Sequence, residues 1–231
     1  MGSIPGVVML SEVNPEGGGW GVLEADSYTS PWEQAKNWYG IQLKKQDYIG
    51  SGKELTSYCH QHQQSLIIRD WTHINFFKHP PTFKQPIEKL LNFEMISEEL
   101  EVKAFAFVRD PIDVWISYGY PDADYFFGQI NRYSKELKKH GIKTFAYEHF
   151  CENPELIIRE ICDYIDIEYS DHFKKFESNE NVNGDIRHPK KKPSRGRLTT
   201  GISLLARIPI PDDKQKEMNN SSEFKKLNEL K

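Results

Sequence analysis

The sequence has few cysteines and no long apolar run, and each absence excludes a class of protein. Its three cysteines are an odd number with no CxxC pair, which argues against a disulfide framework and for reduced thiols in a cytosol-like compartment. No apolar run approaches the roughly 18–20 residues that cross a bilayer as a helix. The first residues also lack the basic and apolar regions of a signal peptide. We therefore expect a cytoplasmic protein with no membrane span.

The chain also lacks an excess of positive charge. Its formal net charge of −4 argues against a general nucleic-acid binder, so nucleic acid is not an expected partner. In contrast, a hydrophobic fraction of 38% and an aromatic fraction of 13% are typical of a folded, globular chain. A length of 231 residues suffices for one domain with its own core, and we expect a single domain over residues 1–231.

Short apolar runs and helical patterns alternate along the chain. The runs are apolar on both faces, as in strands of a parallel sheet that is covered by helices on both sides. These expected strands are Val7–Leu10, Leu66–Arg69, Val102–Val108 and Lys143–Tyr147. The expected helices are Pro86–Ser97, Asp122–His140 and one that begins after Asn153. The alternation predicts right-handed crossovers and an α/β fold of three layers (α/β/α) around a central parallel sheet.

Two helix ends carry recognisable signals. Gly141 follows the second helix and is typical of a left-handed stop. Asn153-Pro154-Glu155 supplies a cap, a proline at the first helical position and an acid in the first turn. Ile157, Ile161 and Ile165 then form a stripe that we expect to be buried.

Three polar stretches lack these patterns. Glu16–Lys36 is loop-like, and Glu177–Arg197 is expected as a long polar loop rich in Asn, Lys, Gly and Pro. Arg207–Lys231 is expected as a polar tail that ends in one short helix. A loop of about twenty residues without secondary structure is uncommon unless it has a function.

The segment around Arg109 joins a strand to a helix. The strand ends at Val108, and Asp110-Pro111 is typical of a helix cap and first turn. Arg109 therefore lies at the carboxyl edge of the sheet, where open α/β sheets bind ligands. Ser117 follows about two turns into the helix, and a guanidinium with a hydroxyl suits a phosphate. The alternative is an arginine in a surface ion pair and a serine that faces solvent.

This segment also resembles a known motif. Arg109, Pro111, Asp113 and Ser117 form Arg-x-Pro-x-Asp-x-x-x-Ser after an expected strand. The pattern resembles the 3′-phosphate-binding motif of sulfotransferases that use 3′-phosphoadenosine 5′-phosphosulfate (PAPS). The resemblance implies that Arg109 and Ser117 bind the 3′-phosphate of this nucleotide.

Two further segments resemble the same family, in the same order along the chain. Ile67–His73 is similar to the strand-end segment that carries the family's catalytic histidine. Tyr147–Phe150, followed by Asn153 and Pro154, is similar to a Tyr-Glu-Asp-hydrophobic segment and its trailing helix. The likeness covers roughly Val7 to Lys231.

The resemblance implies a P-loop NTPase-like sulfotransferase fold with PAPS as the donor substrate and no metal. The implied enzyme transfers a sulfuryl group to a hydroxyl or amine of a small-molecule or glycan acceptor. Two alternatives stay open. One is a non-catalytic or degenerate nucleotide-binding member of the family. The other is a P-loop kinase-like phosphotransferase, which needs a Walker lysine and a magnesium-binding acid, and the sequence offers no convincing example of either.

His73 is the first candidate for the catalytic base. An imidazole with a pKa near 6.5 can be neutral at pH 7 and take a proton from an acceptor hydroxyl. Many family members have a lysine two residues before this histidine, where this chain has Trp71. Glu12, at the end of the first strand, is the second candidate, because some branches of the family use a glutamate there. A lone histidine is more often a hydrogen-bonded structural residue, and Glu12 could equally be a surface acid.

The resemblance assigns further residues to the nucleotide. Ser194, Arg195 and Gly196 match the family's basic, glycine-containing loop over the 3′-phosphate and adenine. Tyr147 is a candidate contact for the adenine, and its alternative is an ordinary aromatic residue at a strand end.

One expected part is missing from the sequence. The family's first strand leads into a Gly/Ser/Thr-rich loop whose backbone N–H groups hold the 5′-phosphosulfate. The chain has no Gly-x-x-x-x-Gly-Lys, and Met1–Gly6 is similar to the stretch after the helix that follows this loop. Gly17–Gly19 comes after the wrong strand to replace it. We therefore expect an N-terminally truncated chain or a degenerate member.

A cluster of potential metal ligands is also present in the sequence. Cys59, His60 and His62 lie close together, but they lack partners at zinc-site intervals. The end of a polar helix explains them more simply, and we expect no metal.

Overall fold

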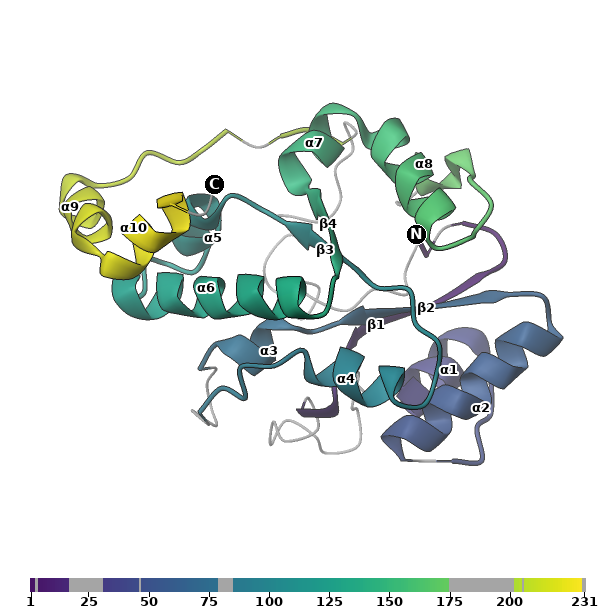
Figure 1. Cartoon of the computed structure of the whole chain (residues 1–231). Coiled ribbons are helices and arrows are strands. Elements are labelled where there is room, and N and C mark those ends of the chain that lie inside the picture. Colours follow the sequence, from purple (N-terminus) through teal and green to yellow (C-terminus); the bar gives the residue numbers. More distant parts are fainter. Residues whose placement is uncertain are drawn as a thin grey trace.

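The computed structural model describes residues 1–2, 4–16, 31–45, 47–78, 85–174, 202–204 and 206–229. Helices and strands alternate along these residues (Figure 1). The strands are β1 (Val7–Val13), β2 (Ser65–Asp70), β3 (Phe105–Val108) and β4 (Lys143–Ala146). The helices before β3 are α1 (Pro31–Tyr39), α2 (Tyr48–Gln61), α3 (His73–Phe76) and α4 (Leu91–Ser97). Those after it are α5 (Pro111–Ser117), α6 (Ala123–Lys139), α7 (Tyr147–Glu152), α8 (Pro154–Tyr164), the 3₁₀ helix η2 (Asp171–Lys174), α9 (Asp212–Asn220) and α10 (Ser222–Glu229).

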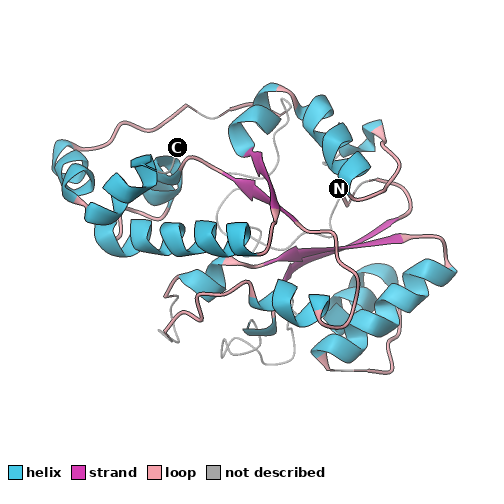
Figure 2. Ribbon diagram, in the orientation of Figure 1, coloured by secondary structure: helices cyan, strands magenta, loops and turns pink. Residues whose placement is uncertain are grey.

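The mixed α/β class and the parallel pairing of strands are confirmed. The described strands form two sheets of two strands each, β1–β2 and β3–β4, rather than one (Figure 2). All four expected strands are present, although β3 begins at Phe105 rather than at Val102. Parallel strands join one sheet only where their backbones hydrogen-bond at about 4.8 Å, and the described strands of the two pairs do not do so.

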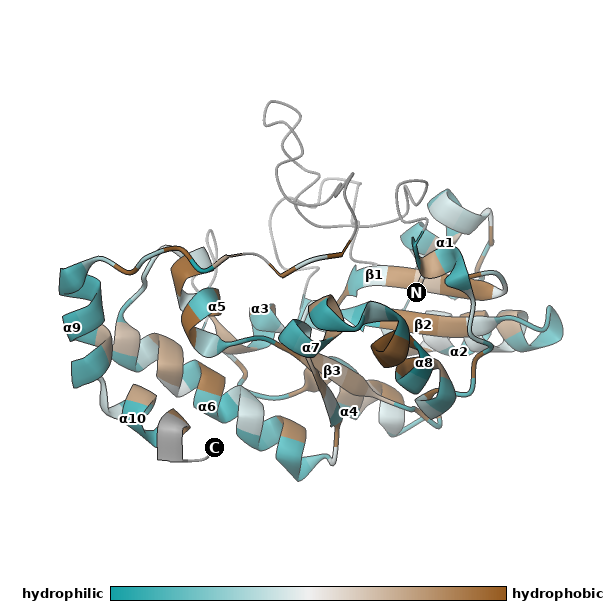
Figure 3. Cartoon of the chain, turned by 90° about the horizontal axis from the view of Figure 1, so that it is seen from above, coloured by the Kyte–Doolittle hydropathy of each residue, from teal (hydrophilic) through white to brown (hydrophobic). Residues whose placement is uncertain are grey.

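Helices pack on both faces of each strand pair. Successive strand residues point to opposite faces, and apolar residues on both faces are covered by helices. On one face of β1–β2, Leu10 and Ile68 pack with residues of α1 and α2. On the opposite face, Val7 and Ile67 share a hydrophobic cluster with α8. For β3–β4, side chains of β3 contact the α6 cluster, and Phe105 and Phe145 join α8. Helix α8 therefore packs against both strand pairs. The brown strands β1 and β2 contrast with the hydrophilic helix α9 in Figure 3.

Local signals fix several helix ends as expected. Asp122 caps α6, where its side chain accepts a hydrogen bond from the backbone N–H of Tyr125 at 2.8 Å. Gly141 follows the end of α6 with φ +63°, a left-handed conformation that costs glycine little. Asn153 differs from the prediction, because its side chain makes no cap hydrogen bond, whereas Pro154 does begin α8.

Other expected boundaries were wrong because tertiary packing extends or shortens weak patterns. Helix α4 begins at Leu91 rather than at Pro86. The loop-like stretch Glu16–Lys36 includes the start of α1, whose Ala35 is buried against β1. The polar tail contains two helices, α9 and α10, rather than one. The expected loop Glu177–Arg197 lies outside the described residues.

Among the helices that the structure describes, none combines the length and apolar character needed to cross a bilayer.

Candidate functional site

Arg109 occupies the junction between β3 and α5, as its sequence position predicts. Strand β3 ends at Val108, and Asp110 caps α5 by accepting a hydrogen bond from the backbone N–H of Ile112 at 2.8 Å. The Arg109 side chain is about one third exposed. Its Nε is buried and has no hydrogen-bond partner among the described residues. A buried N–H without an acceptor is rare in proteins, and here it leaves a donor that a ligand or a water molecule could satisfy.

Tyr147 lies next to Arg109 because their strands are paired in register. Val108 is opposite Ala146 in the parallel β3–β4 pair, so the residues that follow each strand emerge side by side. The guanidinium lies over the Tyr147 ring, with 5.1 Å between Cζ and the ring centroid. A hydrogen bond with the Cys151 side chain, followed by burial, raises the pKa of the Tyr147 phenol. The guanidinium and the ring are therefore stacked as a cation–π pair at the ends of β3 and β4.

A second contact ties the same two strand ends together. The backbone N–H of Asp110 donates to Oε1 of Glu148 at 3.0 Å, which joins the start of α5 to α7. This hydrogen bond holds the turn that carries Arg109 against the turn that carries Tyr147.

Arg207 is a member of this site that the sequence analysis missed. Its Nε lies 2.6 Å from Oδ1 of Asp113, and its NH2 group lies 2.8 Å from Oδ2 of Asp110. Hydrogen bonds to Asp113 and then to Asp110 raise the pKa of Arg207. Its only signal in the sequence is an arginine within the otherwise largely apolar run ISLLARIPI.

Because Arg207 pairs with Asp113, Arg109 forms only a long ion pair with the same carboxylate. Asp113 lies 3.8 Å from NH2 of Arg109, much farther than from Arg207. Ser117 is the last residue of α5 and follows Asp113 by four positions, so the two share one helix face. Asp113 and Ser117 therefore lie on the same face of α5, and Asp113 is the one whose carboxylate lies near Arg109.

A second group of candidates lies at the end of β2. His73 is half-buried and begins α3, and the ring of Trp71 meets its ring edge-on with 5.1 Å between centroids. In Figure 1, helix α3, which follows β2, and helix α5, which follows β3, both lie in the left half of the view. The carboxyl ends of parallel strands are where α/β folds place their ligands.

Glu12 interrupts the end of β1. The register with β2 shifts between Ser11 and Val13, and Glu12 has φ 57°, which is uncommon for a residue with a side chain. Its carboxylate accepts a hydrogen bond from NH2 of Arg69 at 2.7 Å. A bulge of this kind redirects a side chain, and here it directs Glu12 to an ion pair with β2.

Beside these candidates is a buried polar network that the sequence analysis did not identify. Nδ2 of Asn14 lies 2.8 Å from the Asp70 carboxylate and 2.6 Å from Oδ1 of Asn75. Thr72 donates to the other carboxylate oxygen of Asp70 at 2.9 Å. Burial raises the pKa of Asp70, and hydrogen bonds from Asn14, Thr72 and Asn92 oppose that rise. The network joins the ends of β1 and β2 to α3, which carries His73.

The remaining sequence candidates fall into two groups. Ser194, Arg195 and Gly196 lie outside the described residues. Cys59 is buried in α2, whereas His60 is exposed and His62 stacks on Tyr58 with 4.0 Å between ring centroids. These three side chains therefore do not converge on a common point.

No family model, no curated protein and no solved structure matches the chain in comparisons with known proteins. The assignment of a function therefore depends on the residues and geometry of the chain itself.

Proposed function

We propose that the chain binds a 3′-phosphorylated adenine nucleotide at Arg109 and is a PAPS-dependent sulfotransferase. The observation that carries the proposal is the buried Nε of Arg109, which lacks a partner among the described residues. A phosphate oxygen is a strong acceptor for such a donor, and charge-assisted hydrogen bonds of this kind are roughly twice as strong as neutral ones. Ser117, on the same helix face as Asp113, would add a hydroxyl donor to the phosphate.

The surroundings of Arg109 support an adenine nucleotide rather than a free phosphate. Tyr147 lies under the guanidinium, and aromatic rings and arginine planes both stack on nucleobases. Asp110, Asp113 and Glu148 bring more negative charge to this region than Arg109 and Arg207 offset. The proposal therefore requires further positive charge, and the sequence offers Arg195 with Ser194 and Gly196 in a segment outside the described residues.

In the proposed reaction, the acceptor oxygen or nitrogen attacks the sulfur of PAPS in line with the bond to the leaving phosphate oxygen. The new bond to sulfur forms as the sulfur–oxygen bond to the nucleotide breaks, and adenosine 3′,5′-bisphosphate leaves with the electron pair. His73 takes the proton from the acceptor. Glu12 is the second candidate for this base, although its carboxylate is engaged by Arg69.

The proposed fold is the three-layer P-loop NTPase-like arrangement of sulfotransferases. Helices on both faces of two parallel strand pairs support it. A further parallel strand hydrogen-bonded to both pairs would join them into a single central sheet. In this family the additional strand is the one that carries the 5′-phosphosulfate loop.

Isothermal titration calorimetry with two nucleotides tests the proposal. We expect adenosine 3′,5′-bisphosphate to bind and adenosine 5′-monophosphate, which lacks the 3′-phosphate, to bind much more weakly. Arg109→Ala should weaken bisphosphate binding by ~1.5–3 kcal/mol, the range for hydrogen bonds to charged groups.

Arg159→Ala is the matched control. Arg159 also lies over a tyrosine ring, 3.6 Å from the Tyr169 centroid, and pairs with a neighbouring acid, but it belongs to α8. Its loss should leave the affinity unchanged. Equal affinity of the wild type and Arg109→Ala for the bisphosphate would overturn the proposal. Binding without sulfuryl transfer would instead indicate the non-catalytic member of the family.

A further inference from the structure

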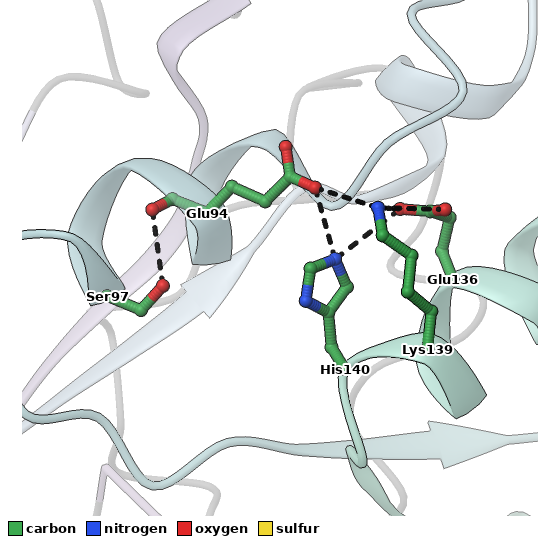
Figure 4. Close-up of polar contacts among 5 residues, drawn as sticks. All are labelled: Glu94, Ser97, Glu136, Lys139 and His140. Atoms are coloured by element: carbon green, nitrogen blue, oxygen red, sulfur yellow. Dashed lines mark hydrogen bonds and ion pairs between the residues drawn. The ribbon is translucent and has the colours of Figure 1, made fainter.

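Three side chains from two helices direct metal-ligand atoms toward a common point. Glu94 lies on α4, Glu136 lies in the last turn of α6, and His140 is the C-cap directly after α6 (Figure 4). One ligand atom of each lies within 4.8 Å of the others. We propose that Glu94, Glu136 and His140 bind a divalent metal ion, for which Zn²⁺ is the best suited. This inference is independent of the proposed function.

The two distances from His140 to the carboxylates fit a tetrahedral ion. Nε2 of His140 lies 3.1 Å from Oε1 of Glu94 and 3.5 Å from Oε2 of Glu136. An ion with bonds of about 2.0–2.1 Å to nitrogen and oxygen needs ligand atoms roughly 3.3 Å apart at tetrahedral angles. Both distances lie within about 0.2 Å of that value, and all three ligand atoms lie within 4.8 Å of one another. A water molecule would complete the tetrahedron.

The backbone and the neighbouring side chains hold the three ligands in place. Glu136 and His140 are four residues apart and lie on one face of the helix end, where the backbone N–H of His140 donates to the Glu136 carbonyl at 3.1 Å. The ring of Phe93 meets the His140 ring edge-on, with 5.3 Å between centroids. The Ser97 hydroxyl donates to the Glu94 carbonyl at 3.2 Å, which supports the α4 turn (Figure 4).

The three ligand side chains are partly buried, so water solvates their charges less well and a bound cation can stabilise them. Side-chain exposure is 24% for Glu94, 16% for Glu136 and 19% for His140. Two carboxylates at this depth require a counter-charge, and a divalent cation supplies two positive charges at one point.

Lys139 partly fills that role and is the competitor of the metal. Its Nζ lies 3.2 Å from Oε1 of Glu94 and 3.0 Å from Oε2 of Glu136 (Figure 4). The Lys139 side chain is 52% exposed, so an incoming ion can displace the ammonium group into water. This competition distinguishes a metal site from a simple ion-pair network. Lys139 stabilises an ion-pair network, but it lowers the affinity of the site for a metal ion.

The donor set and its position define the kind of site. Mg²⁺ and Ca²⁺ prefer six or more oxygen ligands, whereas Zn²⁺ accepts imidazole nitrogen and carboxylate oxygen together in a four-coordinate site. His140 precedes β4 and Tyr147 follows it, so the two mark opposite ends of the same strand. The ion would join α4 to α6 and stabilise the fold, away from the strand ends of the proposed nucleotide site.

Calorimetric titration of the chelator-treated full chain with ZnCl₂ tests the inference. We expect one Zn²⁺ per chain, and little or no heat with MgCl₂. His140→Ala and Glu94→Gln should each weaken Zn²⁺ binding by about tenfold or more, since even indirect ligand partners contribute about 10–100-fold. Lys139→Met should tighten binding, because it removes the competing ammonium. His62→Ala, at the exposed end of α2, is the matched histidine control and should bind as the wild type does.

Thermal unfolding with and without Zn²⁺ provides the second measurement. A ligand that binds only the folded state raises the melting temperature, so Zn²⁺ should stabilise the wild type and Lys139→Met but not His140→Ala. Unchanged Zn²⁺ affinity in both His140→Ala and Glu94→Gln would overturn the inference, as would no binding to Lys139→Met. A loss of binding in His62→Ala alone would move the site to α2 and also overturn it.

Discussion

The guanidinium of Arg109 lies over the ring of Tyr147, 5.1 Å from its centroid, although the two residues follow different strands. The relationship arises from the register of the parallel β3–β4 pair, in which Val108 is opposite Ala146. A cationic donor and an aromatic surface are thereby placed side by side at the carboxyl ends of two strands. A nucleotide offers both an anion and a flat ring, so this pair of residues is the basis of the binding predictions.

Arg207→Ala should weaken the binding of adenosine 3′,5′-bisphosphate, even if Arg207 never touches the ligand. Without Arg207, Asp113 is free to close on Arg109 and compete with the phosphate. A coupling of about 1.4 kcal/mol, or tenfold in affinity, lies within the usual range for neighbouring residues. The double variant Arg207→Ala/Asp113→Asn should recover most of the affinity in calorimetry. If it binds as weakly as the single variant, Arg207 contacts the nucleotide directly.

Ser117→Ala should weaken binding of the same ligand less than Arg109→Ala does. A neutral hydroxyl forms a weaker hydrogen bond with a phosphate than a guanidinium does, so we expect a loss of about 0.5–1.5 kcal/mol. Parallel titrations of the two variants measure the order. The reverse order would mean that the Arg109 side chain points away from the phosphate.

Asp70→Asn should change how the stability of the protein depends on pH. Burial raises the folded-state pKa of Asp70 above its unfolded value near 3.9, so the folded protein holds this proton to higher pH than the unfolded chain. The contribution of Asp70 to stability is therefore fully present below about pH 4 and is lost as pH rises through the folded pKa. Urea unfolding at several pH values should show a smaller decline with pH in Asp70→Asn than in the wild type.

Asp124→Asn is the control with the opposite sign. Hydrogen bonds from the Ser221 side chain and the Glu223 backbone lower the pKa of the exposed Asp124. Its contribution is therefore present at neutral pH and lost as pH falls through the folded pKa, so this variant should lose stability at neutral pH and little in acid. If the two variants shift the profile in the same direction, the pKa of Asp70 in the folded protein is not raised as its burial implies.

His73→Ala should abolish sulfuryl transfer without abolishing nucleotide binding. The prediction applies to a protein in which a 5′-phosphosulfate loop is present to hold the reacting group of PAPS. A positioned general base typically contributes about 10²–10⁴-fold, which sets the expected loss of rate. Transfer of label from PAPS to a hydroxyl acceptor measures the rate, and calorimetry with adenosine 3′,5′-bisphosphate measures binding. A full rate in His73→Ala, with loss of transfer in Glu12→Gln, would assign the base to Glu12.

Local sequence determined the elements that position Arg109. The apolar run that ends at Val108 and the Asp110-Pro111 signal predicted both the strand end and the helix start, because strand burial and capping depend on adjacent residues. The stop at Gly141 was predictable for the same reason, since it depends on backbone conformation at one position. The existence of four strands and their parallel direction also follow from the alternation of local patterns.

Only the tertiary structure decided which distant residues share these sites. Arg207 reaches Asp110 and Asp113 from the tail, and Glu94 meets His140 from another helix. The division of the strands into two pairs, and the buried network around Asp70, were likewise beyond sequence patterns. Hydrophobic periodicity specifies which face of an element is buried, but not which other element covers it. Contacts between distant segments depend on the packing of the whole chain, and that packing placed Arg207 beside Asp110 and Asp113.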